Sequence, residues 1–220
     1  MSVVIAIDGT AACGKGTLAR KLAQHYGFAH LDSGALYRLV ALGVLETGGR
    51  PENEADAVHA AGALDLTRAG SAKIRTDEVG RAASKVAAIS AVRASLKQFQ
   101  QDFAVRPPGN SKGAVIDGRD IGTVIAPDAT AKLYVDAAPE IRARRRQMEL
   151  EGLGIQRSEA DLVAELIARD AADKSRPISP LARAPDAFLL DTSDLGIDAA
   201  FAAALALVDA KVRQALAARL

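Results

Sequence analysis

The sequence predicts an α/β fold in which a mostly parallel sheet is flanked by helices. Short apolar runs alternate along the chain with longer segments whose apolar residues recur at helical spacing. Several of these runs end in aspartate, and a glycine-rich turn joins the first run directly to a helix. Because parallel strands need crossover connections, such alternation favours a sheet covered on both faces, with ligands bound at the carboxyl ends of its strands.

The expected elements follow one another with few interruptions. We expect strands at 3–7, 28–32, 114–117, 131–135 and 188–191. Helices are expected from the glycine-rich turn to Tyr26, then at 35–48, 52–64, 77–86, 92–105, around 142–146, at 158–176 and at 197–216. Ser33 is placed to cap the second helix, and residues 66–76 are expected to form a loop or a short strand.

Composition limits the partners that the chain can attract. The formal net charge is +1, from 28 Lys and Arg against 27 Asp and Glu, so no global field favours nucleic acid or a membrane surface. The single cysteine, Cys13, rules out an intramolecular disulfide and fits a reducing cytosol. No apolar run approaches membrane-spanning length. We therefore expect a cytoplasmic protein, and a monomer, whose partners are small molecules.

Residues 3–17, VVIAIDGTAACGKGT, have the features of a phosphate-binding loop. A glycine-rich turn between a buried strand and a helix points backbone N–H groups and the positive end of the helix dipole into one concavity. Lys15 can reach the β- and γ-phosphates of a nucleoside triphosphate, and the Thr17 hydroxyl can ligate Mg²⁺. The residues expected to bind ATP are Gly9, Thr10, Ala11, Ala12, Cys13, Gly14, Lys15, Gly16 and Thr17.

Asp117 and the arginines add the rest of the expected chemistry. A carboxylate at the tip of a buried strand is positioned to hold Mg²⁺, which makes Asp117 the second expected metal ligand. Arginines suit a phosphotransferase, because two phosphate-bearing substrates repel each other and must both be neutralised. Of the run 142–146 we expect one or two members to contact nucleotide, and choose Arg145. For each of the three histidines a structural role is favoured.

Five segments together carry a family resemblance. They are IDGTAACGKGT, LDSGALYR at 31–38, EVGRAASKVAAISAVR at 78–93, IDGRDIGTVIAPDA at 116–129 and RDAADKSRPISPL at 169–181. On these motifs the sequence resembles the bacterial cytidylate kinases, of the nucleoside monophosphate kinase superfamily, over essentially its whole length. The resemblance implies a P-loop NTPase-type sheet, ATP as phosphoryl donor, Mg²⁺, and transfer to CMP, with dCMP as a second acceptor.

The resemblance also implies roles for individual residues. Lys15, Arg119 and Arg176 are expected to be catalytic. Cytosine is expected to be read by Ser84, Arg93 and Asp120. The Ser84 hydroxyl and the Asp120 carboxylate can accept from its amino group. The full set expected to bind CMP is Ser33, Arg38, Ser84, Arg93, Arg119, Asp120, Arg169, Asp173 and Arg176. In that set Arg38, Arg119 and Arg176 match positions around the acceptor phosphate, and Arg169 and Asp173 match positions near the ribose.

The expected organisation is a single P-loop kinase domain over 1–220. Its core covers about 1–35, 112–150 and 184–220, a monophosphate-binding insertion covers about 36–111, and a lid covers about 150–183. The chain departs from the family pattern in three places. Ala11 and Ala12 stand where Ser-Gly is usual, Cys13 replaces a small residue, and the stretch 64–75 is shorter than the family's insertion, which normally carries a small antiparallel sheet. At position 12, alanine lacks the freedom of glycine to adopt positive φ.

Two alternatives stay open at this point. One is a kinase of another nucleoside monophosphate or a small metabolite, which the same loop would serve. The other is a non-catalytic P-loop regulator or a GTPase, to which Ser71-Ala72-Lys73 bears a superficial likeness. The NKxD sequence that would accompany a GTPase base-recognition tripeptide is missing, so we interpret that match as chance.

Overall fold

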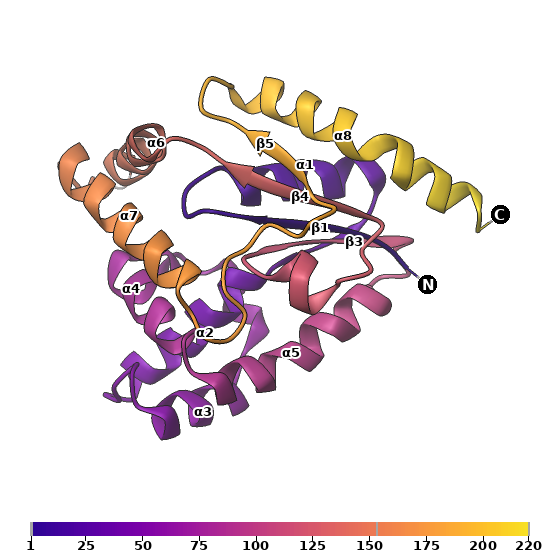
Figure 1. Cartoon of the computed structure of the whole chain (residues 1–220). Coiled ribbons are helices and arrows are strands. Elements are labelled where there is room, and N and C mark those ends of the chain that lie inside the picture. Colours follow the sequence, from indigo (N-terminus) through magenta and orange to yellow (C-terminus); the bar gives the residue numbers. More distant parts are fainter. Residues whose placement is uncertain (1, 153, 220) are drawn as a thin grey trace. The chain divides into compact units, whose positions relative to one another are not determined.

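The computed structural model describes residues 2–152 and 154–219, so residue 153 of the expected lid and both terminal residues lie outside the described part. The chain forms two compact units (Figure 1). The sheet unit comprises residues 1–31 and 104–220, and the helical unit comprises residues 32–103.

A five-stranded sheet organises the sheet unit, in the order β2-β3-β1-β4-β5. Its strands are β1 (Val3–Gly9), β2 (Ala29–Asp32), β3 (Gly113–Gly118), β4 (Ala131–Asp136) and β5 (Phe188–Asp191). β1 pairs in parallel with both β3 and β4, and β4 pairs in parallel with β5. The predicted α/β class with a parallel sheet is confirmed. The central strand β1 is buried along its whole length, which explains the unbroken apolar run from Val3 to Ile7.

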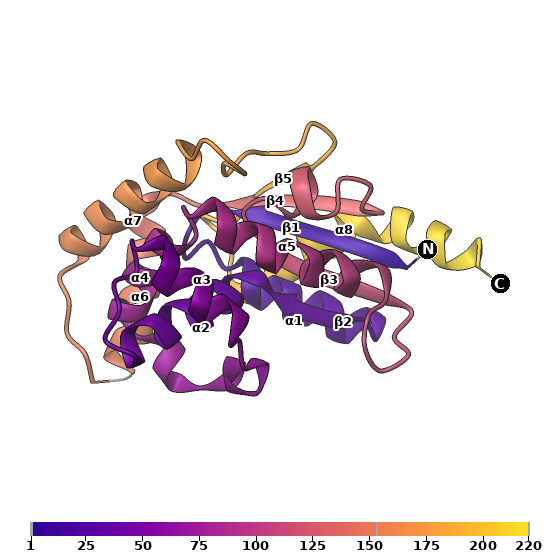
Figure 2. The same cartoon turned by 90° about the horizontal axis from the view of Figure 1, so that it is seen from below.

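Helices α1 (Lys15–Tyr26) and α8 (Ile197–Ala217) cover one face of this sheet (Figures 1 and 2). Their apolar residues pack with those of β1 and β4 into one core cluster, which includes Leu22 and Val208. α1 ends at Tyr26, the residue predicted from the sequence, and Gly27 follows it in the left-handed conformation. Within the described residues, no helix has both the length and the apolar character needed to cross a bilayer.

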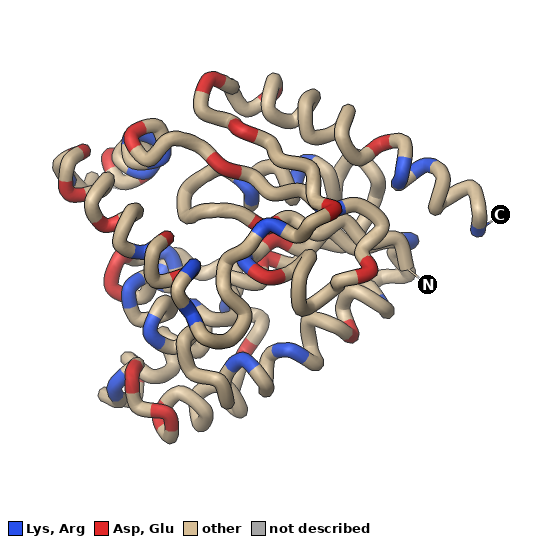
Figure 3. The backbone as a smooth tube through the Cα atoms, viewed as in Figure 1, with Lys and Arg blue, Asp and Glu red and all other residues tan. Residues whose placement is uncertain are grey.

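Two further helices of the sheet unit form an arm, α6 (Pro139–Glu151) and α7 (Glu159–Lys174), which pack against each other. We call this pair the α6–α7 arm. A short π-helical turn, Ile121–Ile125, follows β3; it was not predicted from the sequence. Acidic and basic residues are interspersed along the arm and along α8, as Figure 3 shows, consistent with the near-zero net charge.

The helical unit contains α2 (Ser33–Glu46), α3 (Glu54–Gly62), α4 (Asp77–Val86) and α5 (Ser90–Val105), whose last residues enter the sheet unit. Two expectations need correction here. The cap of α2 is Asp32, whose carboxylate accepts from the Ala35 N–H at 3.1 Å, and Ser33 is already the first helical residue. The stretch 66–76 forms two 3₁₀ turns and no strand, because the side chains of Asp65 and Ser71 bond N–H groups two residues ahead and stabilise short turns.

Candidate active site in the sheet unit

The loop between β1 and α1 lies at the carboxyl edge of the sheet, where the parallel strands β1, β3, β4 and β5 all end. Gly9 passes so close to β4 that a Cβ placed on it would lie 2.0 Å from the Val135 carbonyl oxygen. Ala12 and Gly14 both have left-handed backbone conformations, with φ of 59° and 91°. The loop thus takes the turn for which glycine is suited, but one of its positive-φ positions holds alanine.

Lys15 begins α1 and turns back over the loop, where its ammonium donates to the Thr10 carbonyl oxygen at 3.0 Å. The first turn of α1 has no side-chain cap, so its N–H groups point toward the loop without a side-chain acceptor at the cap position. Burial, and then the positive charge of Arg119, lower the pKa of Lys15. An anion bound at this helix end would stabilise the charged ammonium and accept from the same N–H groups.

Asp117, at the end of β3, is buried and faces the start of α1. Its Oδ1 lies 2.8 Å from His30 Nε2, and its Oδ2 would lie 3.6 Å from a Cβ placed on Gly16. Thr17, which follows Gly16, carries the hydroxyl that was predicted to ligate Mg²⁺. In the structure this hydroxyl accepts from Arg20 at 3.3 Å. The structure therefore places the two predicted metal ligands on adjoining elements. It also pairs Asp117 with His30, for which the sequence had favoured a structural role.

Asp8, at the end of β1, holds the loop that follows β3. Its buried carboxylate accepts from the main-chain N–H groups of Ile121 at 2.8 Å and Gly122 at 2.7 Å. Burial raises the pKa of Asp8 to about 7, although the two N–H donors favour the charged form and oppose the rise. Because Arg119 and Asp120 lie in the segment between Asp117 and Ile121, this clamp fixes the backbone that carries them.

Arg119 and Arg176 meet at one carboxylate, that of Asp173 on α7. Arg119 Nε donates to Asp173 Oδ2 at 2.7 Å, and Arg176 donates to the other oxygen. Burial opposes the charge on both partners. The two guanidinium groups nevertheless lower the pKa of Asp173, and the Asp173 carboxylate raises that of Arg119, so this cluster is ionised at neutral pH. Arg169, one turn earlier on α7, adds positive charge that lowers the pKa of Lys15 and of Asp173.

Arg145, on α6, is bonded to the segment that follows β5. It donates to the Thr192 hydroxyl at 3.1 Å and to the Leu195 carbonyl oxygen at 3.2 Å. The Thr192 hydroxyl in turn donates to the Cys13 carbonyl oxygen at 3.1 Å. Arg145 thus reaches the phosphate loop through Thr192, which the sequence had not singled out. Cys13 itself has its side chain buried in the apolar core beneath the loop, the environment of a small packing residue.

The remaining predicted residues, Ser33, Arg38, Ser84 and Arg93, belong to the helical unit. Arg38 donates to the Ile74 carbonyl oxygen at 2.7 Å, and its guanidinium would lie 3.4 Å from a Cβ placed on Gly80 of α4. Ser84 lies one turn further along α4 and bonds the Gly80 carbonyl oxygen at 3.4 Å. The structure therefore brings Arg38 beside the helix that carries Ser84.

Arg93, on α5, donates to the Ala87 carbonyl oxygen at 3.3 Å, and its guanidinium carbon lies 5.4 Å from the centre of the Tyr37 ring. Arg93 is thus tied to the turn between α4 and α5.

Two buried residues of the α6–α7 arm that contact the phosphate loop were not predicted from the sequence. Arg142 and Asp170 are buried and bond both each other and the main chain of Ala11. Arg142 stood in the run 142–146, where exposure is the usual state, and Asp170 directly follows Arg169 in RDAADKSR. The sequence shows charged residues on both helices of the arm. Their spacing does not show which of them form a pair in the fold.

Comparison with solved structures supports the fold. Shikimate kinase from Bacteroides thetaiotaomicron aligns with a TM-score of 0.50 at 15% identity, covering 95% of this chain and 99% of that one. A gluconokinase from Sinorhizobium meliloti 1021 aligns with a TM-score of 0.51 at 12% identity, covering 98% and 96%. At such low identity these likenesses concern the architecture alone, that of small P-loop kinases.

Sequence comparison is more specific. A model of the family described as cytidylate kinase matches residues 5–210. The cytidylate kinase of Bradyrhizobium diazoefficiens is 50% identical over 208 residues, which cover 94% of this chain and 96% of that protein. The cytidylate kinase of Xanthobacter autotrophicus is 53% identical over 209 residues, covering 95% and 98%. With a family match over most of its length and relatives this similar from end to end, the chain belongs to the cytidylate kinase family.

Proposed function

We propose that the protein transfers the γ-phosphoryl group of ATP to CMP, giving ADP and CDP, and that it also accepts dCMP. The single observation that carries this proposal is the end-to-end family match. The geometry of the sheet unit is compatible with it, because a phosphate loop and an ionised arginine cluster lie on the same unit. The donor and the acceptor of a phosphoryl group both need such positive sites.

The donor side is the loop from Gly9 to Thr17. Its main-chain N–H groups and the positive end of α1 would bind the phosphates of ATP, and Lys15 would leave the Thr10 carbonyl oxygen to contact the β- and γ-phosphates. The bound phosphates would favour the charged form of Lys15 and so reverse the lowering of its pKa. Arg145 is assigned to the nucleotide because Thr192 connects it to the loop.

Thr17 and Asp117 suit Mg²⁺. A hydroxyl and a carboxylate are hard oxygen ligands, and in kinases the remaining positions are filled by substrate phosphates and water. The described residues contain no cluster of three or more metal-binding side chains, which fits an ion shared with the nucleotide better than a fully protein-bound one. When bound with the nucleotide, Mg²⁺ would neutralise phosphate charge. His30 holds one oxygen of Asp117 and so fixes the direction in which the other points.

On the acceptor side we assign Arg38, Arg119 and Arg176 to the CMP phosphate and Arg169 and Asp173 to its ribose. A phosphate oxygen of CMP is already an anion, so no strong general base is needed; alignment and charge neutralisation carry the chemistry. Both oxygens of Asp173 are bonded to arginines in the structure, so binding of CMP must rearrange these contacts. Ser33 completes the acceptor set.

Asp120, Ser84 and Arg93 are assigned to the base. Cytosine presents an amino donor where uracil presents a carbonyl acceptor, so the carboxylate of Asp120 and the hydroxyl of Ser84 can accept from CMP but oppose UMP. We therefore expect a higher kcat/KM for CMP than for UMP, with the other common monophosphates lower still.

A coupled assay of ADP release with each of the common nucleoside monophosphates tests the proposal. The expected result is rapid ADP release with CMP and dCMP. Equal efficiency for CMP and UMP would contradict the assignment of Asp120 and Ser84. A protein that binds ATP yet releases no ADP with any monophosphate would instead be a regulator, and fast turnover of a different acceptor would make it another small-molecule kinase. We also propose that the enzyme is a cytoplasmic monomer; light scattering tests the oligomeric state.

A further inference from the structure

The main chain of Ala11, in the phosphate loop, is held by both helices of the α6–α7 arm. The Ala11 N–H donates to Asp170 Oδ1 of α7 at 3.1 Å. Its carbonyl oxygen accepts from Arg142 Nη1 of α6 at 3.0 Å. Arg142 Nη1 also donates to Asp170 Oδ2 at 2.6 Å, and Arg142 Nε donates to the Ala137 carbonyl oxygen at 2.8 Å. One residue of the loop is thus clasped at both its donor and its acceptor. We call Arg142 and Asp170 the Ala11 clasp.

Packing reinforces the clasp at the same place. The methyl group of Ala11 lies in a buried cluster with Ala143 and Leu150 of α6 and with Leu162 and Leu166 of α7. Ala12 packs against the same cluster. The loop is therefore joined to the arm by apolar contacts as well as by hydrogen bonds, which places the two alanines at the junction between loop and arm.

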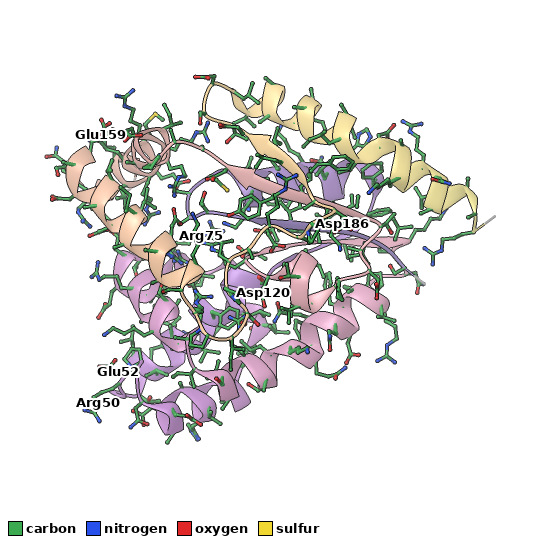
Figure 4. All side chains as sticks on the ribbon, viewed as in Figure 1. Arg50, Glu52, Arg75, Asp120, Glu159 and Asp186 are labelled. Atoms are coloured by element: carbon green, nitrogen blue, oxygen red, sulfur yellow. The ribbon has the colours of Figure 1, made fainter. Side chains whose placement is uncertain are left out.

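Burial makes this clasp different from an ordinary ion pair. The side chains of Arg142 and Asp170 are 4% and 7% exposed, so removing one partner leaves an uncompensated charge out of water. A second pair joins the same two helices, Arg144 and Glu159, at 3.0 Å, but its side chains are 62% and 38% exposed. Figure 4 shows Glu159 at the outer end of α7, away from the loop. This exposed pair offers a matched control, because it links α6 to α7 without contacting Ala11.

We propose that Arg142 and Asp170 are positioning residues, which set the conformation of the phosphate loop for ATP by holding Ala11. The proposal rests on the proposed function, since it assumes that the loop binds ATP. Because α7 also carries Asp173 one turn further on, the clasp ties the loop to the helix whose next turn holds Arg119 and Arg176. The arm thereby fixes the donor loop and the arginine cluster relative to one common helix.

The test compares ATP binding by three full-length variants with that of the wild type, by calorimetry below the unfolding temperature. Asp170→Asn keeps the size of the side chain but loses the charge that binds Arg142. We expect its Kd for ATP to rise about tenfold, while its Kd for CMP stays within twofold. Glu159→Gln removes the same charge from the same helix and should leave both constants unchanged. The double variant Arg142→Met with Asp170→Leu replaces the clasp by apolar side chains, which such a buried pair often tolerates. It should fold and lose ATP affinity to a similar extent.

Three results would overturn the inference. The first is an ATP affinity within twofold of the wild type in either folded variant, which would leave the clasp a role in stability alone. The second is an equal loss of ATP and CMP affinity, which would mean a general distortion of α7. The third is an equal loss of ATP affinity in Glu159→Gln, which would mean that any change of charge on the arm weakens ATP binding. A wild-type protein that binds no ATP would contradict the proposed function itself, a different outcome from any of these.

Discussion

Asp170 and Asp173 lie one turn apart on α7, and both are buried carboxylates paired with arginine. They differ in their other hydrogen-bond partners. Asp170 bonds the main chain of the phosphate loop, and its partner Arg142 bonds two further main-chain carbonyl groups. Asp173 bonds two guanidinium groups, those of Arg119 and Arg176. A carboxylate that bonds the main chain holds the backbone conformation. A carboxylate that bonds only arginine side chains can be replaced by another anion, because those side chains can turn toward it.

A phosphate group could replace the Asp173 carboxylate as the partner of Arg119 and Arg176. Phosphate and carboxylate both accept two hydrogen bonds from the planar guanidinium fork, so a phosphate can replace a carboxylate as the partner of arginine. The pKa values of Asp173 and Arg119 are shifted in the directions that keep both charged. We infer that Asp173 holds the two arginines extended and charged until the acceptor phosphate binds. The comparison predicts that variants of the arginine cluster change turnover, and that variants of backbone-anchored carboxylates change stability or positioning.

The largest expected effect is that of Arg119→Ala. Removing a guanidinium that neutralises a transferring phosphoryl group should lower kcat by about 10³-fold or more, and leave the fold intact. Steady-state ADP release together with thermal unfolding measures both quantities. Arg144→Ala is the matched control, since Arg144 is an exposed arginine bonded to Glu159, and it should keep the wild-type rate. A folded Arg119→Ala protein with a near-normal rate would remove Arg119 from the mechanism and break the comparison.

A smaller effect, on stability, is expected at Asp8, the other carboxylate anchored to the main chain. Its pKa is raised from 3.8 to about 7 in the folded protein. Below about pH 4 both folded and unfolded forms hold the proton; as pH rises toward 7 the unfolded form loses it first, so the free energy of unfolding falls by as much as ~4 kcal/mol. Above pH 7 both forms are ionised and the loss is constant. In Asp8→Asn this pH dependence should vanish.

Urea unfolding of both proteins at several values between pH 4 and 8 measures the difference. The stability of the wild type relative to Asp8→Asn should decline across this range. Parallel curves would mean that the two N–H donors, from Ile121 and Gly122, keep the Asp8 carboxylate ionised in the fold, and that burial is the weaker influence.

The sequence predicted the sheet well, since the strands other than β2 are short, mostly apolar runs and several of the strands end in aspartate at the carboxyl edge of the sheet. It also marked position 12 as one where alanine lacks the freedom of glycine to adopt positive φ, and in the structure Ala12 does have a positive φ, of 59°. It could not predict the Ala11 clasp or the pairing of His30 with Asp117, because both join residues far apart in the chain. The 3₁₀ turns at 66–76 were missed for a local reason: short side-chain caps stabilise structures too small to show periodicity.

The smallest expected effect separates the two alanines of the phosphate loop. Ala12 has φ of 59°, where a Cβ costs about 1 kcal/mol or more, so Ala12→Gly should relieve strain. Part of the gain is offset by the greater chain entropy of the unfolded variant and by lost packing on the arm, which leaves a net stabilisation below about 1 kcal/mol. Ala11→Gly is the control with the opposite sign: its methyl group is buried in the arm cluster, so this change should destabilise by about 1–2 kcal/mol. Urea unfolding measures both. Equal destabilisation by Ala12→Gly and Ala11→Gly would contradict this expectation. It would mean that the contact of the Ala12 methyl group with the arm outweighs the backbone strain at position 12, so that the arm holds both alanines by their side chains as well as Ala11 by its main chain.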